Sequence, residues 1–282
     1  MALPGTTNAM TIDFAAARTA ADFLRLWLER RLLSPAGERL LGDYYGNFRG
    51  LNSAHLRHWY NQQTLEVLDL VRRMPGARLL EVGVGTGTET LWLALNGAHV
   101  TAIDAFEHCA TVARERLAIV ERELGRPLAC RIETTALLEY EAPQGFDILW
   151  LEQVIHHMEP REASFRKLAE LVRPGGYVAV AEANALNPLL QAQLLRARGL
   201  RMTLEVDTPQ GRLVYGNERI LSLRALSRAF AAVGIEPVSG RYFRLFPSHP
   251  FFDRLFGLER ALAGPWLAPL CTHYNYVGRK VA

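Results

Sequence analysis

The stretch LLEVGVGTGTETLWLALNGAHVTAID, from Leu79 to Asp104, constrains the fold of this chain more than any other segment. An apolar run leads into three closely spaced glycines, Gly83, Gly85 and Gly87, and a second apolar run ends on an acid. The glycines stand where a first strand must turn into a helix. Because glycine has no Cβ, such a turn lets a ligand lie directly against main-chain atoms. The segment therefore predicts a strand, a thin turn that faces a ligand, a helix and a second strand.

The rest of the chain continues this alternation of buried strands and helical stretches. The expected strands are 78–84, 99–104, 129–134, 146–154 and 177–184, with two further candidates at 236–246 and 272–281. The expected helices are Thr88–Asn96, Glu107–Leu124 and Arg161–Val172, the last stopped by the sequence RPGG. This order is typical of an α/β fold with a Rossmann-like, doubly wound, mostly parallel sheet of seven strands. Such sheets bind ligands at the carboxyl ends of their strands.

The sequence divides into two predicted parts. Residues 1–58 read as a helical N-terminal cap, and residues 59–282 as the ligand-binding domain. The alternation breaks at about 185–220 and again at 247–271, and both stretches are interpreted as lid insertions.

Composition narrows the class of protein. A formal net charge of +3 over 282 residues, with scattered arginines, gives no footprint for nucleic acid. The three cysteines lack metal-ligand spacing, which favours reduced thiols. No apolar run is long enough to span a bilayer, and the start of the chain lacks the pattern of a signal peptide. A cytoplasmic protein with a small-molecule ligand is expected.

The glycine spacing excludes two common nucleotide motifs. A dinucleotide fingerprint needs a third glycine at Thr88, and a phosphate loop needs a lysine that the turn lacks. The motif LLEVGVGTG, with Asp104 after the second strand, FDILWLEQVIHHMEP at the fourth and LAELVRPGGYVAVAEAN at the fifth, instead resembles class I S-adenosylmethionine-dependent methyltransferases. The resemblance runs from about Trp59 to Asn184 and implies S-adenosylmethionine as the cofactor, with S-adenosylhomocysteine as its product.

Several residues follow as cofactor-binding candidates. Asp104 ends the second strand, where a carboxylate can accept bonds from both hydroxyls of a ribose, although it could also cap the next helix. Glu81 lies inside an apolar strand and needs polar partners, whether cofactor or backbone. The other candidates at this site are Ala105, Phe106, Glu152, Gln153 and Tyr60.

One position departs from the pattern of the family. An acid usually follows the third strand and takes the adenine amino group, whereas this chain has Thr135 and Ala136 there. A threonine hydroxyl or the amides of Ala136 and Leu137 remain to serve adenine.

The catalytic candidates come directly after the fourth strand. Methyl transfer requires alignment and, for a hydroxyl or carbon acceptor, a proton acceptor. His157 is the preferred base and His156 the second choice, although either could simply bond a loop. No metal set is evident, so metal-independent catalysis is expected.

These observations predict a methyltransferase that acts on oxygen, nitrogen or carbon of a small, partly hydrophobic acceptor. Arginines such as Arg196 near an apolar lid suggest an anionic group on that acceptor, and Tyr45 is a further lid candidate. A homodimer is possible. The alternative is a protein that binds S-adenosylmethionine or its product without methylating, as a partner subunit or for another reaction.

Overall fold

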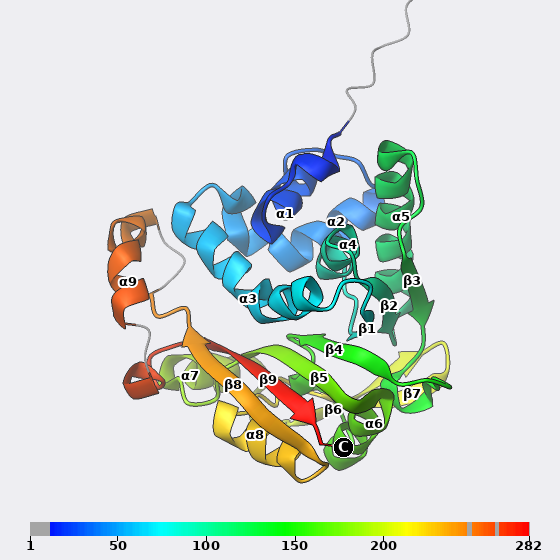
Figure 1. Ribbon diagram of the computed structural model, residues 1–282. Coiled ribbons are helices and arrows are strands. Elements are labelled where there is room, and N and C mark those ends of the chain that lie inside the picture. Colours follow the sequence, from blue (N-terminus) through cyan, green and yellow to red (C-terminus); the bar gives the residue numbers. More distant parts are fainter. Residues whose placement is uncertain (1–11, 247–249, 263–264, 282) are drawn as a thin grey trace, which may run out of the picture.

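A seven-stranded sheet forms the centre of the computed structural model, which describes residues 12–246, 250–262 and 265–281 (Figure 1). Its order is β3-β2-β1-β4-β5-β9-β8, and β9 runs antiparallel to both neighbours while the other pairs are parallel. The strands are β1 (Arg78–Val82), β2 (His99–Asp104), β3 (Cys130–Thr134), β4 (Phe146–Glu152), β5 (Val172–Ala183), β8 (Ile235–Phe243) and β9 (His273–Lys280). The predicted α/β class with a mostly parallel seven-stranded sheet is confirmed.

Helices cover both faces of this sheet. One face carries α3 (Ala54–Arg73), α4 (Thr88–Leu95) and α5 (Glu107–Leu124), and the other carries α6 (Arg161–Leu171) and α8 (Leu223–Ala231) (Figure 1). Alternate residues of a strand point to opposite faces of the sheet. Leu79 is buried under the first set of helices and Leu80 under the second. Burial of each such side chain stabilises the fold by about 1.5–3 kcal/mol.

Two predicted helix ends shift slightly. Helix α4 ends at Leu95 instead of Asn96, and α6 ends at Leu171 instead of Val172. Val172 already has extended backbone angles, so RPGG lies within β5 and does not itself stop the helix.

The N-terminal helices α1 (Ala20–Leu28) and α2 (Pro35–Tyr45) pack outside this layer, α1 against α3 and α4, and α2 against α5. Phe23 and Trp27 of α1 share one apolar core with the sheet. The boundary predicted after residue 58 falls inside α3, because that helix begins at Ala54 and continues to Arg73.

The first predicted insertion folds into α7 (Pro188–Arg198) and a hairpin of β6 (Thr203–Thr208) and β7 (Gly211–Gly216). A backbone bridge joins Tyr215 to Met158 after β4, and Gln210 Nε2 donates to the Thr134 carbonyl at 2.9 Å. The hairpin therefore crosses the carboxyl ends of β4 and β3.

The second predicted insertion contains α9 (Phe256–Leu262) between short 3₁₀ turns at Pro250–Leu255 and Pro265–Leu267. Its residues 247–249 and 263–264 lie outside the described part. Among the described residues, no helix combines the length and apolar character needed to cross a bilayer.

Candidate active site

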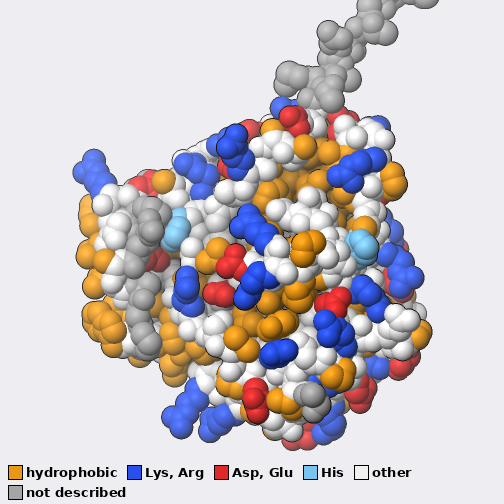
Figure 2. Space-filling model, viewed as in Figure 1, with side chains coloured by type: hydrophobic (Ala, Val, Ile, Leu, Met, Phe, Trp, Pro, Cys, Tyr) orange, Lys and Arg blue, Asp and Glu red, His pale blue; other side chains and the backbone are white. Residues whose placement is uncertain are grey.

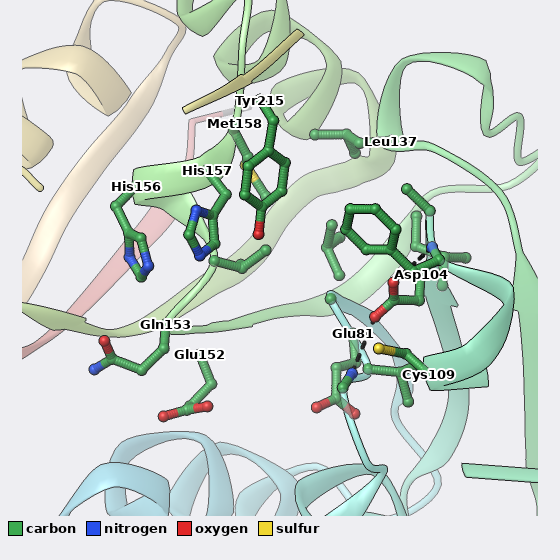
Figure 3. Close-up of a pocket in the computed structure, with 18 of the residues that line it drawn as sticks. Glu81, Asp104, Cys109, Leu137, Glu152, Gln153, His156, His157, Met158 and Tyr215 are labelled. Atoms are coloured by element: carbon green, nitrogen blue, oxygen red, sulfur yellow. Dashed lines mark hydrogen bonds between the residues drawn. The ribbon is translucent and has the colours of Figure 1, made fainter. Parts of the chain in front are cut away.

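A cavity of about 660 Å³ lies at the carboxyl edge of the sheet, beneath the β6–β7 hairpin (Figure 3). The predicted site residues that line it are Tyr60, Glu81, Gly83, Gly85, Asp104, Ala105, Phe106, Thr135, Ala136, Glu152, Gln153, His156 and His157. Gly87 is not among the lining residues. A Cβ at Gly87 would lie 2.8 Å from Cβ of Ala113, so this glycine lets α4 start close against α5.

The turn after β1 needs glycine at two positions. Gly83 has φ 84° and Gly85 has φ 52°, both in the left-handed region. A Cβ on Gly83 would lie 2.6 Å from Val154 Cγ2, and one on Gly85 would lie 2.9 Å from Tyr44 Cε1. Both glycines line the cavity, and the space that a Cβ would need is already filled by Val154 and Tyr44.

The carboxylate of Asp104 is held in place beside this turn. Its Oδ2 accepts from the Gly85 amide at 3.0 Å and its Oδ1 accepts from the Phe106 amide at 2.9 Å (Figure 3). Burial raises the pKa of Asp104, while these two amides act against the rise. Each carboxylate oxygen can still accept another bond from a ligand in the cavity.

The position after β3 also borders the cavity. The Thr135 amide donates to the Asp104 carbonyl at 2.8 Å, which continues the pairing of β3 with β2. That amide is therefore occupied. The Thr135 hydroxyl and the amides of Ala136 and Leu137 are the groups that remain to bind an adenine base.

Three carboxylates gather at the β1 and β4 end of the cavity: Glu81 and Glu89 are buried, and Glu152 is half-buried. Their donors are Thr90 Oγ1 at 2.5 Å, Tyr60 Oη and Gln63 Nε2 at 2.6 Å, respectively. Burial raises the pKa of all three, and for Glu81 and Glu152 the charge of Glu89 adds to the rise. Gathered carboxylates of this kind favour a ligand that brings positive charge, as S-adenosylmethionine does with its sulfonium and ammonium groups.

Gln153 adds a polar group to the same wall. Its backbone has φ 48°, and its buried Nε2 has no hydrogen-bond partner among the described residues. A left-handed residue with an unpaired buried donor is typical of a ligand-binding position. The glycine turn, Asp104, the acidic end and Gln153 together fit the polar and cationic groups of S-adenosylmethionine.

His156 forms a buried dyad with Glu182 near the end of β5. Its Nδ1 lies 2.8 Å from Glu182 Oε1, and its amide donates to Glu182 Oε2 at 3.1 Å. Its Nε2 lies 3.6 Å from Glu218 Oε2. Burial alone would lower the pKa of His156, but Glu182 and then Glu218 outweigh it, so the pKa is raised. His156 thus favours the imidazolium form.

His157 has the opposite electrostatic environment. Burial, followed by the charge of His156, lowers its pKa to about 4. Its Nδ1 lies 2.9 Å from the Gly216 carbonyl, which can only accept, so Nδ1 carries the proton and Nε2, which lies 3.9 Å from Glu218 Oε1, is unprotonated. The ring stacks on Tyr215 with centroids 4.2 Å apart and 19° between planes. Figure 3 shows both rings at the cavity wall.

The two histidines, together with Glu218, could instead bind a metal cation. His156, His157 and Glu218 each place a ligand atom within 4.8 Å of the others. The sequence analysis missed this group because Glu218 comes from the insertion, and metal-independent catalysis stays a prediction.

Several lining or supporting residues escaped the sequence analysis. Glu182 is a buried acid in an apolar strand, the same signal that singled out Glu81, so it could have been found. Tyr215 and Tyr44 carry no comparable signal, because only the folded hairpin and α2 bring them to the cavity. Tyr45 lines the cavity, whereas Arg196 is exposed on α7 and does not.

Comparison with known proteins agrees with this geometry. Residues 80–180 match the family model described as a methyltransferase domain. A ubiquinone biosynthesis O-methyltransferase of Chromobacterium violaceum is 30% identical over 65% of this chain and 75% of its own length. That of Xylella fastidiosa is 31% identical over 74% and 86%.

Solved structures show the same fold. Magnesium protoporphyrin IX methyltransferase from Synechocystis PCC 6803, solved with bound S-adenosylhomocysteine, superposes with a TM-score of 0.53 at 15% identity and covers 86% of this chain and 99% of its own. The structural similarity shows the fold alone, whereas the sequence relatives also show the family. The chain therefore belongs to the class I S-adenosylmethionine-dependent methyltransferases and is an enzyme of the kind that methylates small organic acceptors.

Proposed function

We propose that this enzyme is an O-methyltransferase that methylates a hydroxyl group of a small, ring-bearing acceptor, with His157 as the proton acceptor. The observation that carries the proposal is the pair of adjacent histidines, one with a raised pKa and one with a pKa lowered to about 4, at the carboxyl end of β4. Neighbouring groups whose pKa values are pushed apart are the mark of divided acid and base roles.

The residues that line the cavity support a place for the cofactor. S-adenosylmethionine supplies the methyl group as an electrophilic carbon on a positively charged sulfur. Asp104 would accept hydrogen bonds from the ribose hydroxyls, and Gly83 and Gly85 would let the nucleoside approach the backbone. Phe106 would border the adenine. The residues that complete this wall are Tyr60, Glu81, Ala105, Thr135, Ala136, Glu152 and Gln153.

His157 Nε2 accepts the proton of the acceptor's hydroxyl group. Its Nε2 is unprotonated at neutral pH and, since Nδ1 is bonded to Gly216, the ring is held with that nitrogen available. His156, favoured as an imidazolium by Glu182, stabilises the negative charge that grows on the acceptor oxygen. The hydroxyl oxygen is thereby made more nucleophilic without an outside base.

Two further observations support an oxygen acceptor with a ring. The relatives from Chromobacterium and Xylella are named as O-methyltransferases of ubiquinone biosynthesis. Aromatic side chains also face the cavity on the acceptor side, with Tyr215 stacked on His157 and edge-on to Phe106, their centroids 5.7 Å apart. Such rings bury flat apolar ligands well.

The test incubates the purified protein with labelled S-adenosylmethionine and fractionated metabolites, followed by mass analysis of the products. We expect a methyl ether, and a loss of about 100-fold or more in turnover for His157→Gln with S-adenosylhomocysteine affinity unchanged. His99→Gln is the matched control, because His99 is exposed at the opposite edge of the sheet. Binding of S-adenosylhomocysteine without transfer to any acceptor would favour the non-methylating alternative instead.

The cytoplasmic location and the possible homodimer belong to this proposal as well. Sedimentation of the purified protein tests the second, since a dimer would double the mass of the 31.6 kDa chain.

A further inference from the structure

The cavity has a second end, at strands β8 and β9, away from the strands that carry the proposed cofactor-binding residues. Arg244 follows β8 and His273 begins β9, and both line the cavity. Strand β9 is antiparallel to β5, so its first residue lies at the same edge as the end of β5, with His273 paired to Ala183. The acidic group lies at β1 and β4, whereas this end, at β9 and β8, is cationic.

Arg244 is half-buried at this end and packs on an aromatic ring. Its guanidinium lies over the Trp59 ring, 4.7 Å from the centroid, and its Nη1 lies 3.5 Å from His273 Nε2. Its backbone has φ 64°, a conformation that a non-glycine residue adopts at a cost. Burial lowers the pKa of Arg244 to about 10, which leaves it charged at neutral pH.

The surrounding groups orient this pair. The His273 ring is fixed by a contact of 2.9 Å between its Nδ1 and Thr272 Oγ1. Burial, Arg244 and His156 all lower the pKa of His273, so this imidazole is neutral beside the guanidinium. Glu259 of α9 offsets part of the Arg244 charge, while its Oε1 accepts from Trp59 Nε1 at 3.0 Å and from the Leu245 amide at 2.8 Å.

We propose that Arg244, which His273 orients through its Nε2, forms a subsite that binds a carboxylate of the methyl acceptor. This inference rests on the proposed function and narrows its substrate class to hydroxylated organic acids. A planar guanidinium binds a carboxylate through two parallel bonds, which suits a half-buried position on an aromatic ring.

The sheet sets the length of such an acceptor. The histidine pair follows β4 and His273 begins β9, two strands away in the order β4-β5-β9. Neighbouring strands lie about 4.8 Å apart, so the carboxylate and the methylated hydroxyl are separated by roughly 10 Å. A phenol with a short unsaturated acid side chain has about this span.

The amino-acid part of the cofactor also carries a carboxylate, and the experiment separates the two sources. The protein is saturated with S-adenosylhomocysteine, and 4-hydroxycinnamate and its neutral methyl ester are titrated by calorimetry. We expect the acid to bind wild type at least tenfold more tightly than the ester. Arg244→Gln should abolish this preference, and Arg244→Lys should reduce it, because lysine keeps the charge but lacks the two-pronged geometry.

The controls keep the result interpretable. Arg241→Gln changes an arginine of β8, the strand that Arg244 follows. The Arg241 side chain is 57% exposed, and this variant should retain the preference. The affinity of each variant for S-adenosylhomocysteine, which reports folding as well, should stay within twofold of wild type. The binding readout needs no methyl transfer, so it is independent of the labelled-methyl test of the proposed function.

Three results would overturn the assignment: equal or absent binding of acid and ester by wild type, a preference that survives Arg244→Gln, or a loss of tenfold or more in S-adenosylhomocysteine affinity on that substitution. If affinity for methylthioadenosine, which lacks the amino-acid part, were then unchanged, the subsite would belong to the cofactor's carboxylate.

Discussion

The protonation of His157 can be measured directly, without knowing the acceptor. The ordinary pKa of histidine is about 6.5, and burial together with the charge of His156 lowers that of His157 to about 4. At pH 5, His157 would therefore be about 90% neutral, whereas an unperturbed histidine would be about 3% neutral. A base with this property stays competent in mildly acidic solution.

The assay is a titration of the ring C–H resonances by two-dimensional NMR, with His157→Gln to assign the signal. His156→Gln should move the His157 transition to higher pH, because it removes a neighbouring positive charge whose ring centroid is 4.0 Å away. A unit charge at that distance and an effective dielectric of about 20–80 is worth about 1–4 kcal/mol, or roughly one pKa unit or more.

The same shift predicts a loss of stability in acid. The unfolded chain binds a proton on His157 near pH 6.5 and the folded chain only near pH 4, so stability falls as the pH drops between these values. The loss is at most about 3.5 kcal/mol, from a shift of about 2.5 pKa units at about 1.4 kcal/mol each. A His157 transition at or above pH 6.5 in wild type, or one unmoved by His156→Gln, would refute this account of the histidine pair.

Four other outcomes follow from the structure. Asp104→Asn should weaken S-adenosylhomocysteine binding by about 10- to 100-fold in calorimetry, since bonds to a charged acceptor are worth about 1.5–3 kcal/mol; unchanged affinity would remove Asp104 from the ribose site. Gly83→Ala should destabilise the fold by about 1–3 kcal/mol in urea, because φ is 84° and the new Cβ meets Val154; an equally stable variant would contradict the packing. Glu182→Gln should lower the His156 pKa by NMR, and a constant pKa would argue against the dyad. A chelator should leave activity intact, and loss restored by magnesium would show a metal enzyme.

The local pattern predicted the sheet and several residues that the structure places on the cavity wall. Gly83, Gly85 and Asp104 belong to one continuous strand, turn, helix and strand, so their spacing along the chain already fixes their spacing in space. His156 and His157 were likewise found because they directly follow a strand end, where ligands bind.

The cavity residues that come from the hairpin and from the last two strands could not be predicted in the same way. Tyr215 reaches His157 through a hairpin whose position depends on its bridge to Met158. Arg244 reaches the cavity because β9 pairs antiparallel with both β5 and β8, which brings the end of β8 to the same edge of the sheet. Neither the contact of Tyr215 with His157 nor the place of Arg244 at the cavity follows from spacing along the chain. Arg196, singled out because it lies in the lid insertion, is instead exposed, since the sequence could not show which face of α7 meets solvent.

A crystal structure of the S-adenosylhomocysteine complex would show whether the cavity holds the cofactor as proposed. We expect both ribose hydroxyls on the Asp104 carboxylate, the nucleoside against the backbone of Gly83 and Gly85, and the sulfur directed toward His157. A complex in which the sugar lies away from Asp104, or the sulfur faces away from the histidine pair, would contradict this proposal.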